Sequence, residues 1–147
     1  MITIRNSTLN DIDAITFLLG ELGYPATHDE VRLRFAQIAS HPDYKTLLAV
    51  VDGKIVGMIG MLRSHSYEHN GQYIRILAMV VDREHQNKGI GKKLLAGADR
   101  WANENNAFAM VLNSGNRPER QSAYLFYQKM GFEIRSFGFI KKFKTLS

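Results

Sequence analysis

The sequence predicts an α/β fold in which seven strand-like segments are interspersed with four helix-like segments. Two observations support this prediction: short apolar runs bounded by turn residues, and longer segments with apolar residues at helical spacing. In chain order they give one strand, two helices, three strands, a helix, a strand, a helix and two final strands. The 147 residues are 45% hydrophobic and 22% charged, which suits a single globular domain spanning residues 1–147.

The first strand and two helices are predicted from short local patterns. Residues 2–5 alternate apolar and polar side chains, as a strand does. Thr8 with Asp11 resembles a helix start, and the capping box Thr27-His-Asp-Glu30 opens a second helix. His41-Pro42 ends that helix, because the residue before a proline disfavours helical backbone angles.

The middle of the chain predicts a hairpin followed by a third strand. Strands at residues 44–51 and 54–62 flank Asp52-Gly53, a strong sequence pattern for a two-residue hairpin turn. A strand at residues 72–81 follows. The later elements are a helix at about 89–105, a strand at 108–112, a helix from Pro118 to Gly131, and a terminal hairpin of strands 132–135 and 139–143.

The stretch from Val80 to Leu95 joins a strand to a helix through a loop that contains glycines. Gly89 and Gly91 stand at the helix entrance, where backbone N–H groups lack intrahelical partners and the helix dipole is positive. Glycine allows a phosphate to approach this backbone closely, so the stretch favours a phosphorylated ligand. It matches neither a Walker loop nor a dinucleotide fingerprint. The nearby positive charges are Lys88, Lys92 and Lys93.

Two motifs together resemble the GNAT acetyltransferase family. Gln86-x-x-Gly89-x-Gly91 is similar to the acyl-CoA pyrophosphate loop of these enzymes. About thirty residues later, Ala123-x-x-Phe-Tyr127-x-x-x-Gly-Phe132 matches the family's late segment. Taken alone, the glycine pair also suits an ordinary strand-to-helix turn, but two motifs in the family's order and separation are far more specific.

The resemblance implies a central mixed, twisted sheet of six to seven strands flanked by about four helices. It also implies an enzyme that transfers the acetyl group of acetyl-CoA directly to a primary amine of a small molecule. The cofactor-binding residues carried over from the family are Met79, Val80, Val81, Gln86, Asn87, Lys88, Gly89, Ile90, Gly91, Lys92, Asn116, Ala123 and Tyr127. For the pantetheine contact, Asn113 and Ser114 are alternatives to Asn116.

Tyr127 is the predicted catalytic residue, because the resemblance places this tyrosine beside the thiol sulfur. A phenol can protonate a leaving thiolate, since their unperturbed pKa values lie within about two units. The alternative is that Tyr127 only packs its ring in the core; Tyr124 ranks lower as an acid. The family places a bulge on the preceding strand, so a backbone N–H of Met79 or Val80 is the expected donor to the oxyanion.

One position departs from the pattern of many small-molecule enzymes of the family. They carry a glutamate on the strand before the glycine loop, used as a base, where this chain has Leu77. The sequence therefore leaves open how the acceptor amine loses its proton. Water could relay the proton to a main-chain carbonyl, or the amine could already be neutral when it binds. Two alternative functions also stay open: a non-catalytic acyl-CoA-binding or regulatory domain, and an acetyltransferase acting on protein N-termini or lysines.

Composition and local patterns argue against other classes of protein. There is no cysteine, so disulfides and thiolate sites are excluded. The net charge of +5 is scattered, with clusters only at 88–93 and 141–144, which argues against nucleic acid as a partner. His65-Ser-Tyr-Glu-His69 matches a zinc-peptidase pattern, but it lies between strands rather than on a helix, so no metal is expected. Without a signal peptide or a membrane span, we expect a cytoplasmic protein; the sequence leaves open whether it forms a homodimer.

Overall fold

The computed structural model describes residues 1–113, 121–136 and 138–143. They divide into two compact units, Met1–Leu112 and Asn113–Ser147, and each is described by itself below. The first unit contains the whole sheet and three α-helices, and the second contains one further helix.

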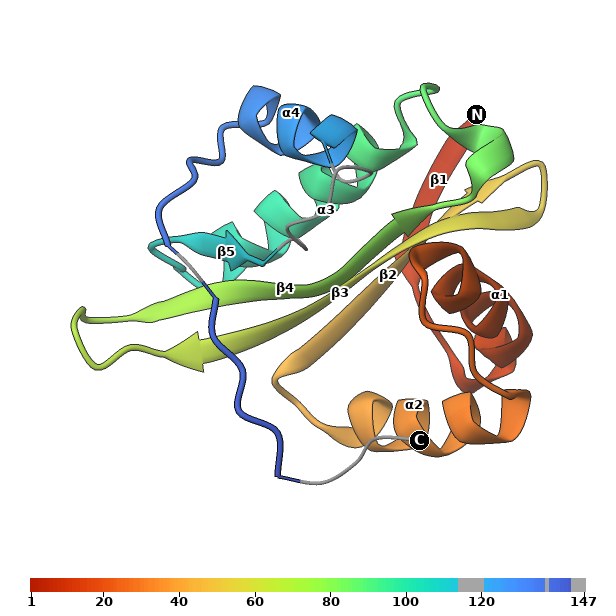
Figure 1. Cartoon of the computed structure of the whole chain (residues 1–147). Coiled ribbons are helices and arrows are strands. Elements are labelled where there is room, and N and C mark those ends of the chain that lie inside the picture. The colour runs from red at the N-terminus through yellow and green to blue at the C-terminus, as the bar shows by residue number, and fades with distance from the viewer. Residues whose placement is uncertain (114–120, 137, 144–147) are drawn as a thin grey trace. The chain divides into compact units, whose positions relative to one another are not determined.

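The sheet has five strands in the order β1-β2-β3-β4-β5, and it twists visibly across its width (Figure 1). The first four strands pair antiparallel with their neighbours, whereas β4 and β5 pair parallel, so the predicted mixed sheet is confirmed. The strands are β1 (Ile2–Asn6), β2 (Tyr44–Val51), β3 (Lys54–His65), β4 (Gln72–Val81) and β5 (Met110–Leu112).

The prediction of six to seven strands exceeds what the described residues form. The two strands expected at 132–135 and 139–143 are absent from the described parts of these segments. Aromatic and β-branched residues suggested them, but such residues favour strands because they pack on a half-buried surface. Here Ile134 and Phe139 have relative exposures of 75% and 96%, so that packing is missing.

Four α-helices are present among the described residues, as predicted. They are α1 (Ile12–Leu22), α2 (His28–Ser40), α3 (Ile90–Glu104) and α4 (Gln121–Lys129), with short 3-10 turns η1 (Leu9–Asp11) and η2 (Arg83–His85). The helix start predicted at Thr8 and Asp11 exists and forms a capping box, but its first turn is η1, and the α-helix begins at Ile12. Its Asp11 is 7% exposed, and two hydrogen bonds join its carboxylate to the guanidinium of Arg5.

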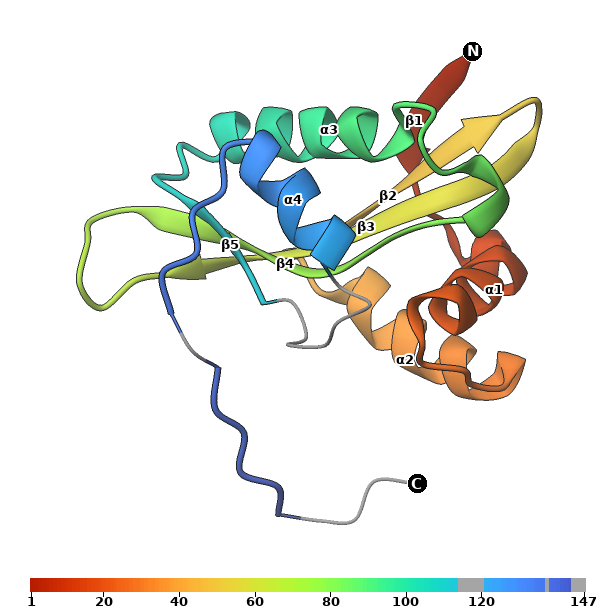
Figure 2. The same cartoon turned by 45° about the horizontal axis from the view of Figure 1, so that its top comes forward.

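In the first unit, α3 covers one face of the sheet, while α1 and α2 cover the other (Figures 1 and 2). Amphipathic spacing decides this, because each helix turns its apolar stripe to the sheet. The core under α1 and α2 is formed by Ile12, Ile15, Leu18, Val31, Phe35, Leu48, Met58 and Val80. The buried residues that α3 contributes are Ile90, Leu94, Leu95 and Ala98.

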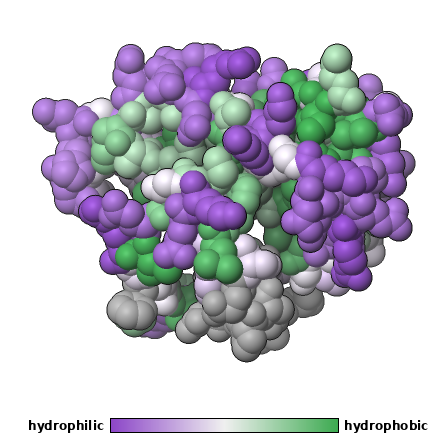
Figure 3. Space-filling model, turned by 90° about the horizontal axis from the view of Figure 1, so that it is seen from above, coloured by the Kyte–Doolittle hydropathy of each residue, from purple (hydrophilic) through white to green (hydrophobic). Residues whose placement is uncertain are grey.

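The helices of the described residues are too short or too polar to cross a membrane. On the face shown in Figure 3, hydrophilic and hydrophobic side chains are interspersed.

Candidate functional site

A β-bulge interrupts β4 at Leu77. Gly60 of β3 pairs with Ala78, but the next residue, Met61, pairs with Ile76, so Leu77 has no partner on β3. The family-derived expectation of a bulge on this strand is met, and the bulge lies two residues before Met79, the first of the predicted oxyanion donors. Leu77 is 50% exposed, and it stands where the family resemblance led us to look for a glutamate.

Beyond the bulge, one edge of β4 carries no neighbouring strand among the described residues. The parallel pairing with β5 covers only residues 74–76. Asp82 donates its backbone N–H to the carbonyl of Val56 at 2.7 Å. Because hydrogen-bonded and non-hydrogen-bonded pairs alternate in an antiparallel ladder, the Val80 amide also faces β3, whereas the amides of Met79 and Val81 point to the open edge.

The turn after β4 is held from within by Asp82, which is 3% exposed. Its carboxylate accepts the backbone N–H of Glu84 at 3.2 Å and lies 3.6 Å from Nζ of Lys54 and 3.4 Å from Nδ1 of His85. Burial raises the pKa of Asp82, but the Glu84 amide, the Lys54 ammonium and the His85 ring together outweigh burial, so the pKa lies below its usual value. Asp82 therefore stays ionised and fixes the direction in which the chain leaves the sheet.

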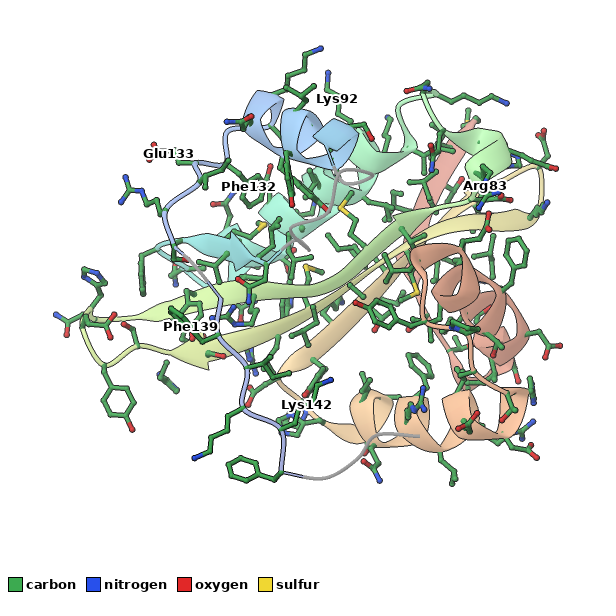
Figure 4. The ribbon with its side chains drawn as sticks, viewed as in Figure 1. Arg83, Lys92, Phe132, Glu133, Phe139 and Lys142 are labelled. Carbon is green, nitrogen blue, oxygen red and sulfur yellow. The ribbon has the colours of Figure 1, made fainter. Side chains whose placement is uncertain are left out.

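A contact from α1 holds the same turn from outside. Glu21 Oε1 accepts the backbone N–H of Arg83 at 3.1 Å, and its other oxygen lies 3.9 Å from the Arg83 guanidinium. Figure 4 shows Arg83 beside the end of β4, and Lys92 on the helix that follows. The loop between β4 and α3 is thus anchored at its start by two carboxylates.

The N-terminus of α3 is not capped by any side chain of the described residues. Gly89 is the N-cap residue, with φ of +81°, and no side chain caps the helix. Lys93 donates the first intrahelical hydrogen bond, to the Gly89 carbonyl, so the amides of the turn before it have no intrahelical acceptor. A left-handed conformation at Asn87, with φ of +63°, reverses the chain just before this turn.

Most of the loop is exposed, as a binding site for a charged ligand requires. Gln86, Asn87, Lys88, Gly89 and Lys92 are all solvent-exposed, and Gln86 Nε2 donates to the Val81 carbonyl at 3.4 Å. Ile90 is the exception: its side chain is 2% exposed and belongs to the core, so only its main chain can contact a ligand.

A glycine on β3 brings the first turns of α3 close to the sheet. A Cβ built on Gly57 would lie 3.2 Å from Leu94 Cδ1, 3.2 Å from the Val80 carbonyl and 3.3 Å from Ile90 Cγ2. Such distances are tighter than ordinary contact, so any larger residue at this position would push the helix away. Gly57 therefore contributes to the position of the open N-terminus of α3.

In the second unit, the Tyr-x-x-x-Gly-Phe motif is the C-cap of α4. The Phe132 N–H donates to the Tyr127 carbonyl at 3.0 Å, and the Gly131 N–H donates to the Gln128 carbonyl at 3.1 Å. With φ of +96° at Gly131, this is a Schellman motif, and the rings of Tyr127 and Phe132 make its usual apolar contact at 5.8 Å. The predicted C-cap at Gly131 is confirmed.

The Tyr127 ring also meets Phe126, with ring centroids 5.5 Å apart. Ala123, one turn earlier, is half-buried, as are Tyr124 and Tyr127. The cap therefore fixes the orientation of the Tyr127 ring, whatever its hydroxyl does. Asn116 lies outside the described residues, and so does Ser114, while Asn113 is exposed.

No cluster of three or more potential metal ligands exists among the described residues. His65 ends β3, and His69 follows in the turn, so the two histidines do not share a helix face as the zinc-peptidase pattern requires. His69 instead packs against Phe108, with ring centroids 5.0 Å apart.

The sequence pattern of the Acetyltransferase (GNAT) family matches residues 10–132. The chain belongs to this family. It is an acetyl-CoA-dependent N-acetyltransferase, because both the family match and the relatives described next are of this class. The two motifs that suggested the family lie within the matched region or at its end.

Among its relatives, this GNAT enzyme is 29% identical to the aminoalkylphosphonate N-acetyltransferase of Salmonella typhimurium over 143 residues, covering 94% of this chain and 89% of that protein. It is 34% identical to a GNAT family acetyltransferase of Staphylococcus aureus of known structure, with a TM-score of 0.82 and coverage of 97% and 98% of the two chains. An aminoglycoside N-acetyltransferase solved in complex with CoA shares the fold, at 19% identity, a TM-score of 0.84 and coverage of 99% and 96%.

Sequence reasoning missed the residues that hold this GNAT enzyme's loop in place. Asp82 directly follows an apolar strand and precedes a polar turn, a pattern that could have suggested a capping aspartate. His85 is a lone histidine in the sequence, with no motif around it, and it lies beside that carboxylate. Glu21 is 62 residues from Arg83 in the chain, and no local pattern predicts that contact.

Proposed function

We propose that the chain binds acetyl-CoA between the open N-terminus of α3 and the open edge of β4, and acetylates a small primary amine there. The observation that carries the proposal is the uncapped first turn of α3 with Gly89 and Gly91, placed next to an unpaired strand edge. Amides and dipole at the helix end suit the pyrophosphate, and Lys88 and Lys92 add positive charge. The extended arm of the cofactor would pair with β4 as an added strand does.

The acetyl carbonyl would accept a hydrogen bond from Met79. Of the two candidates from the sequence, Met79 is favoured over Val80, because the alternation of the ladder directs the Val80 amide to β3. A donor fixed by a bulged strand stabilises the oxyanion without reorganising during the reaction. Val81, whose amide points to the same edge, would bind the cofactor arm.

The transfer is a single displacement on the thioester. The neutral amine nitrogen forms a bond to the carbonyl carbon, the carbon–sulfur bond breaks, and the departing thiolate takes the phenolic proton of Tyr127. The amine's surplus proton passes to water, since Leu77 replaces the glutamate base, and water then reprotonates Tyr127. Support for Tyr127 comes from its place in the family motif and from the cap that fixes its ring.

The acceptor is proposed to be a small molecule, as it is for the aminoalkylphosphonate enzyme that matches nearly the whole chain. CoA release measured against a panel of small amines and a panel of peptides tests this. Release with small amines and not with peptides is expected. Release with peptides alone would show a protein acetyltransferase, and CoA binding without release from any acceptor would show a binding domain.

A further inference from the structure

The sheet face that packs on α1 and α2 has open space beside the bulge. A Cβ built on Gly60 would meet no atom within 4 Å, and its partner across the ladder is Ala78, another small residue. Met58 belongs to the core under α1 and α2, and Gly60 lies two residues further along β3, so both share that face. The other face is closed by contrast, since a Cβ on Gly57 would press on α3.

This open space adjoins the proposed reacting centre. Ala78 directly precedes Met79, the proposed oxyanion donor, and the cofactor's phosphates are assigned to the α3 face. The acceptor amine must therefore approach the acetyl group from the face that carries Gly60. This step rests on the function proposed above.

Arg75 lies on the same face, next to that space. It pairs with Leu62, two residues beyond Gly60 on β3, so Arg75 and Gly60 are diagonal neighbours about 7 to 8 Å apart. The Arg75 guanidinium lies 5.8 Å from the centre of the Tyr73 ring and has no carboxylate partner among the described residues. A half-buried arginine in that state has its donors available for an anion.

Among the described residues that the strand register places on this part of the face, none is acidic. Asp43 directly precedes Tyr44 in the sequence, but its carboxylate accepts a hydrogen bond from Arg63 Nε at 2.8 Å. The described side chains around the open space on β2, β3 and β4 are Tyr44, Thr46, Leu62, Ser64, Tyr73 and Arg75. A polycationic acceptor would meet a positive charge here and no negative one.

We infer that the acceptor is a short amine with an anionic group at its other end, held by Arg75 above Gly60 and Ala78. A phosphonate, phosphate or carboxylate provides the paired oxygens that a guanidinium binds through two parallel hydrogen bonds. The small floor residues leave room for the chain that joins the two ends. Because of the bulge, Arg75 and Met79 pair with Leu62 and Ile59, which are only three residues apart on β3, so they lie about 10 Å apart along β4. The arginine side chain covers part of that interval.

Steady-state kinetics with four acceptors test the inference: 2-aminoethylphosphonate, β-alanine, propylamine and an aminoglycoside. The native enzyme should prefer one of the two anionic amines, and Arg75→Leu should raise KM for that amine about 10- to 100-fold while leaving propylamine unchanged. Arg75→Lys should retain part of the preference. Arg100→Leu, which removes an exposed arginine from the solvent face of α3, is the control and should change neither.

A second variant tests the open space itself. Gly60→Val should fold normally, because nothing occupies the space and β-branched residues suit strands. It should lower kcat/KM for the acceptor at least about tenfold with CoA affinity, measured by calorimetry, unchanged. Equal use of propylamine or the aminoglycoside, or a KM that ignores Arg75→Leu, would overturn the inference and leave the proposed function standing. No CoA release with any amine would overturn both.

Discussion

The N-termini of α2 and α3 differ in how the backbone amides of the first helical turn find hydrogen-bond acceptors. At α2, the Thr27 hydroxyl accepts the Glu30 amide at 3.1 Å, and the Glu30 carboxylate accepts the Thr27 amide at 2.9 Å. The first turn of α2 also carries Asp29, so two carboxylates face the positive end of the dipole. At α3, the N-cap is Gly89, no side chain caps the helix, and the first turn has no acidic residue.

The two termini differ in the source of the negative charge at the positive end of the helix dipole. At α2 the protein supplies it, and the Thr27 amide and hydroxyl hold the pKa of Glu30 below its usual value. At α3 no side chain of the described residues supplies it, and we propose that an external anion does. GNAT acetyltransferases use acetyl-CoA, so the pyrophosphate of that cofactor is the anion that we propose for the uncapped terminus of α3.

The largest expected effect is that of substituting Tyr127 on α4, which we propose acts in the chemical step and not in CoA binding at α3. Tyr127→Phe should lower kcat about 10² to 10⁴-fold, because the thiolate loses its proton donor, while CoA affinity stays nearly unchanged. The ring contacts with Phe126 and Phe132 remain, so stability should fall by no more than about 1 kcal/mol. Turnover and thermal unfolding, measured on the same preparation, decide the matter. A normal kcat with chemistry rate-limiting would leave Tyr127 a packing residue only.

A substitution in the first turn of α3 should move stability and binding in opposite directions. Gly91→Ala should weaken CoA binding about 10- to 100-fold, because a methyl group occupies space proposed for the pyrophosphate. The ligand-free protein should be as stable as before or slightly more so, since alanine favours a helix over glycine by up to about 1 kcal/mol. Calorimetry and thermal unfolding measure the two quantities.

Gly20→Ala is the matched control for that substitution. Gly20 lies in α1, and a Cβ there meets nothing within 4 Å, so this variant shows the helix effect without a ligand. If Gly91→Ala left the CoA affinity at its native value, the difference between the α2 and α3 termini would have another cause.

Local patterns predicted the elements of the first unit well. The strands at 44–51 and 72–81 have the predicted bounds, and Asp52 and Gly53, both with positive φ, form the predicted hairpin turn. The capping box at Thr27 needed only four neighbouring residues to be recognised. Such features are decided by interactions between near neighbours, so the sequence contains them directly.

What the sequence could not predict depends on contacts between distant segments. The bulge at Leu77 shows only in the register of β3 against β4, and it came from the family resemblance rather than from local pattern. The anchoring of Arg83 by Glu21 joins α1 to the loop across the fold. The prediction of a terminal hairpin was wrong for a related reason. Strand propensity reflects packing on a half-buried surface, and the described residues of that segment make no such packing.

A smaller effect is expected at the N-terminus of α2, which is capped by Thr27 and Glu30. Thr27→Ala removes the hydroxyl that caps α2 and should lower the free energy of unfolding by about 1 kcal/mol, or the melting temperature by about 3 °C. CoA affinity should not change, because this terminus serves only the helix. Ser40→Ala removes a hydroxyl from the other end of the same helix, where it donates to the Gln37 carbonyl, and should cost less. Weaker CoA binding in Thr27→Ala would contradict the division of roles.

The smallest expected effect asks whether charge or main chain holds the anion at α3. Lys88 is exposed beside Gly89, so Lys88→Ala should raise the CoA dissociation constant only a few-fold at low salt. The difference should vanish near 1 M salt, where the screening length falls to about 3 Å, whereas the effect of Gly91→Ala should persist. Arg32→Ala, which removes an exposed cation from α2, provides the control for net charge. A Lys88→Ala loss as large as that of Gly91→Ala, and equally insensitive to salt, would assign the anion to the side chain rather than to the amides.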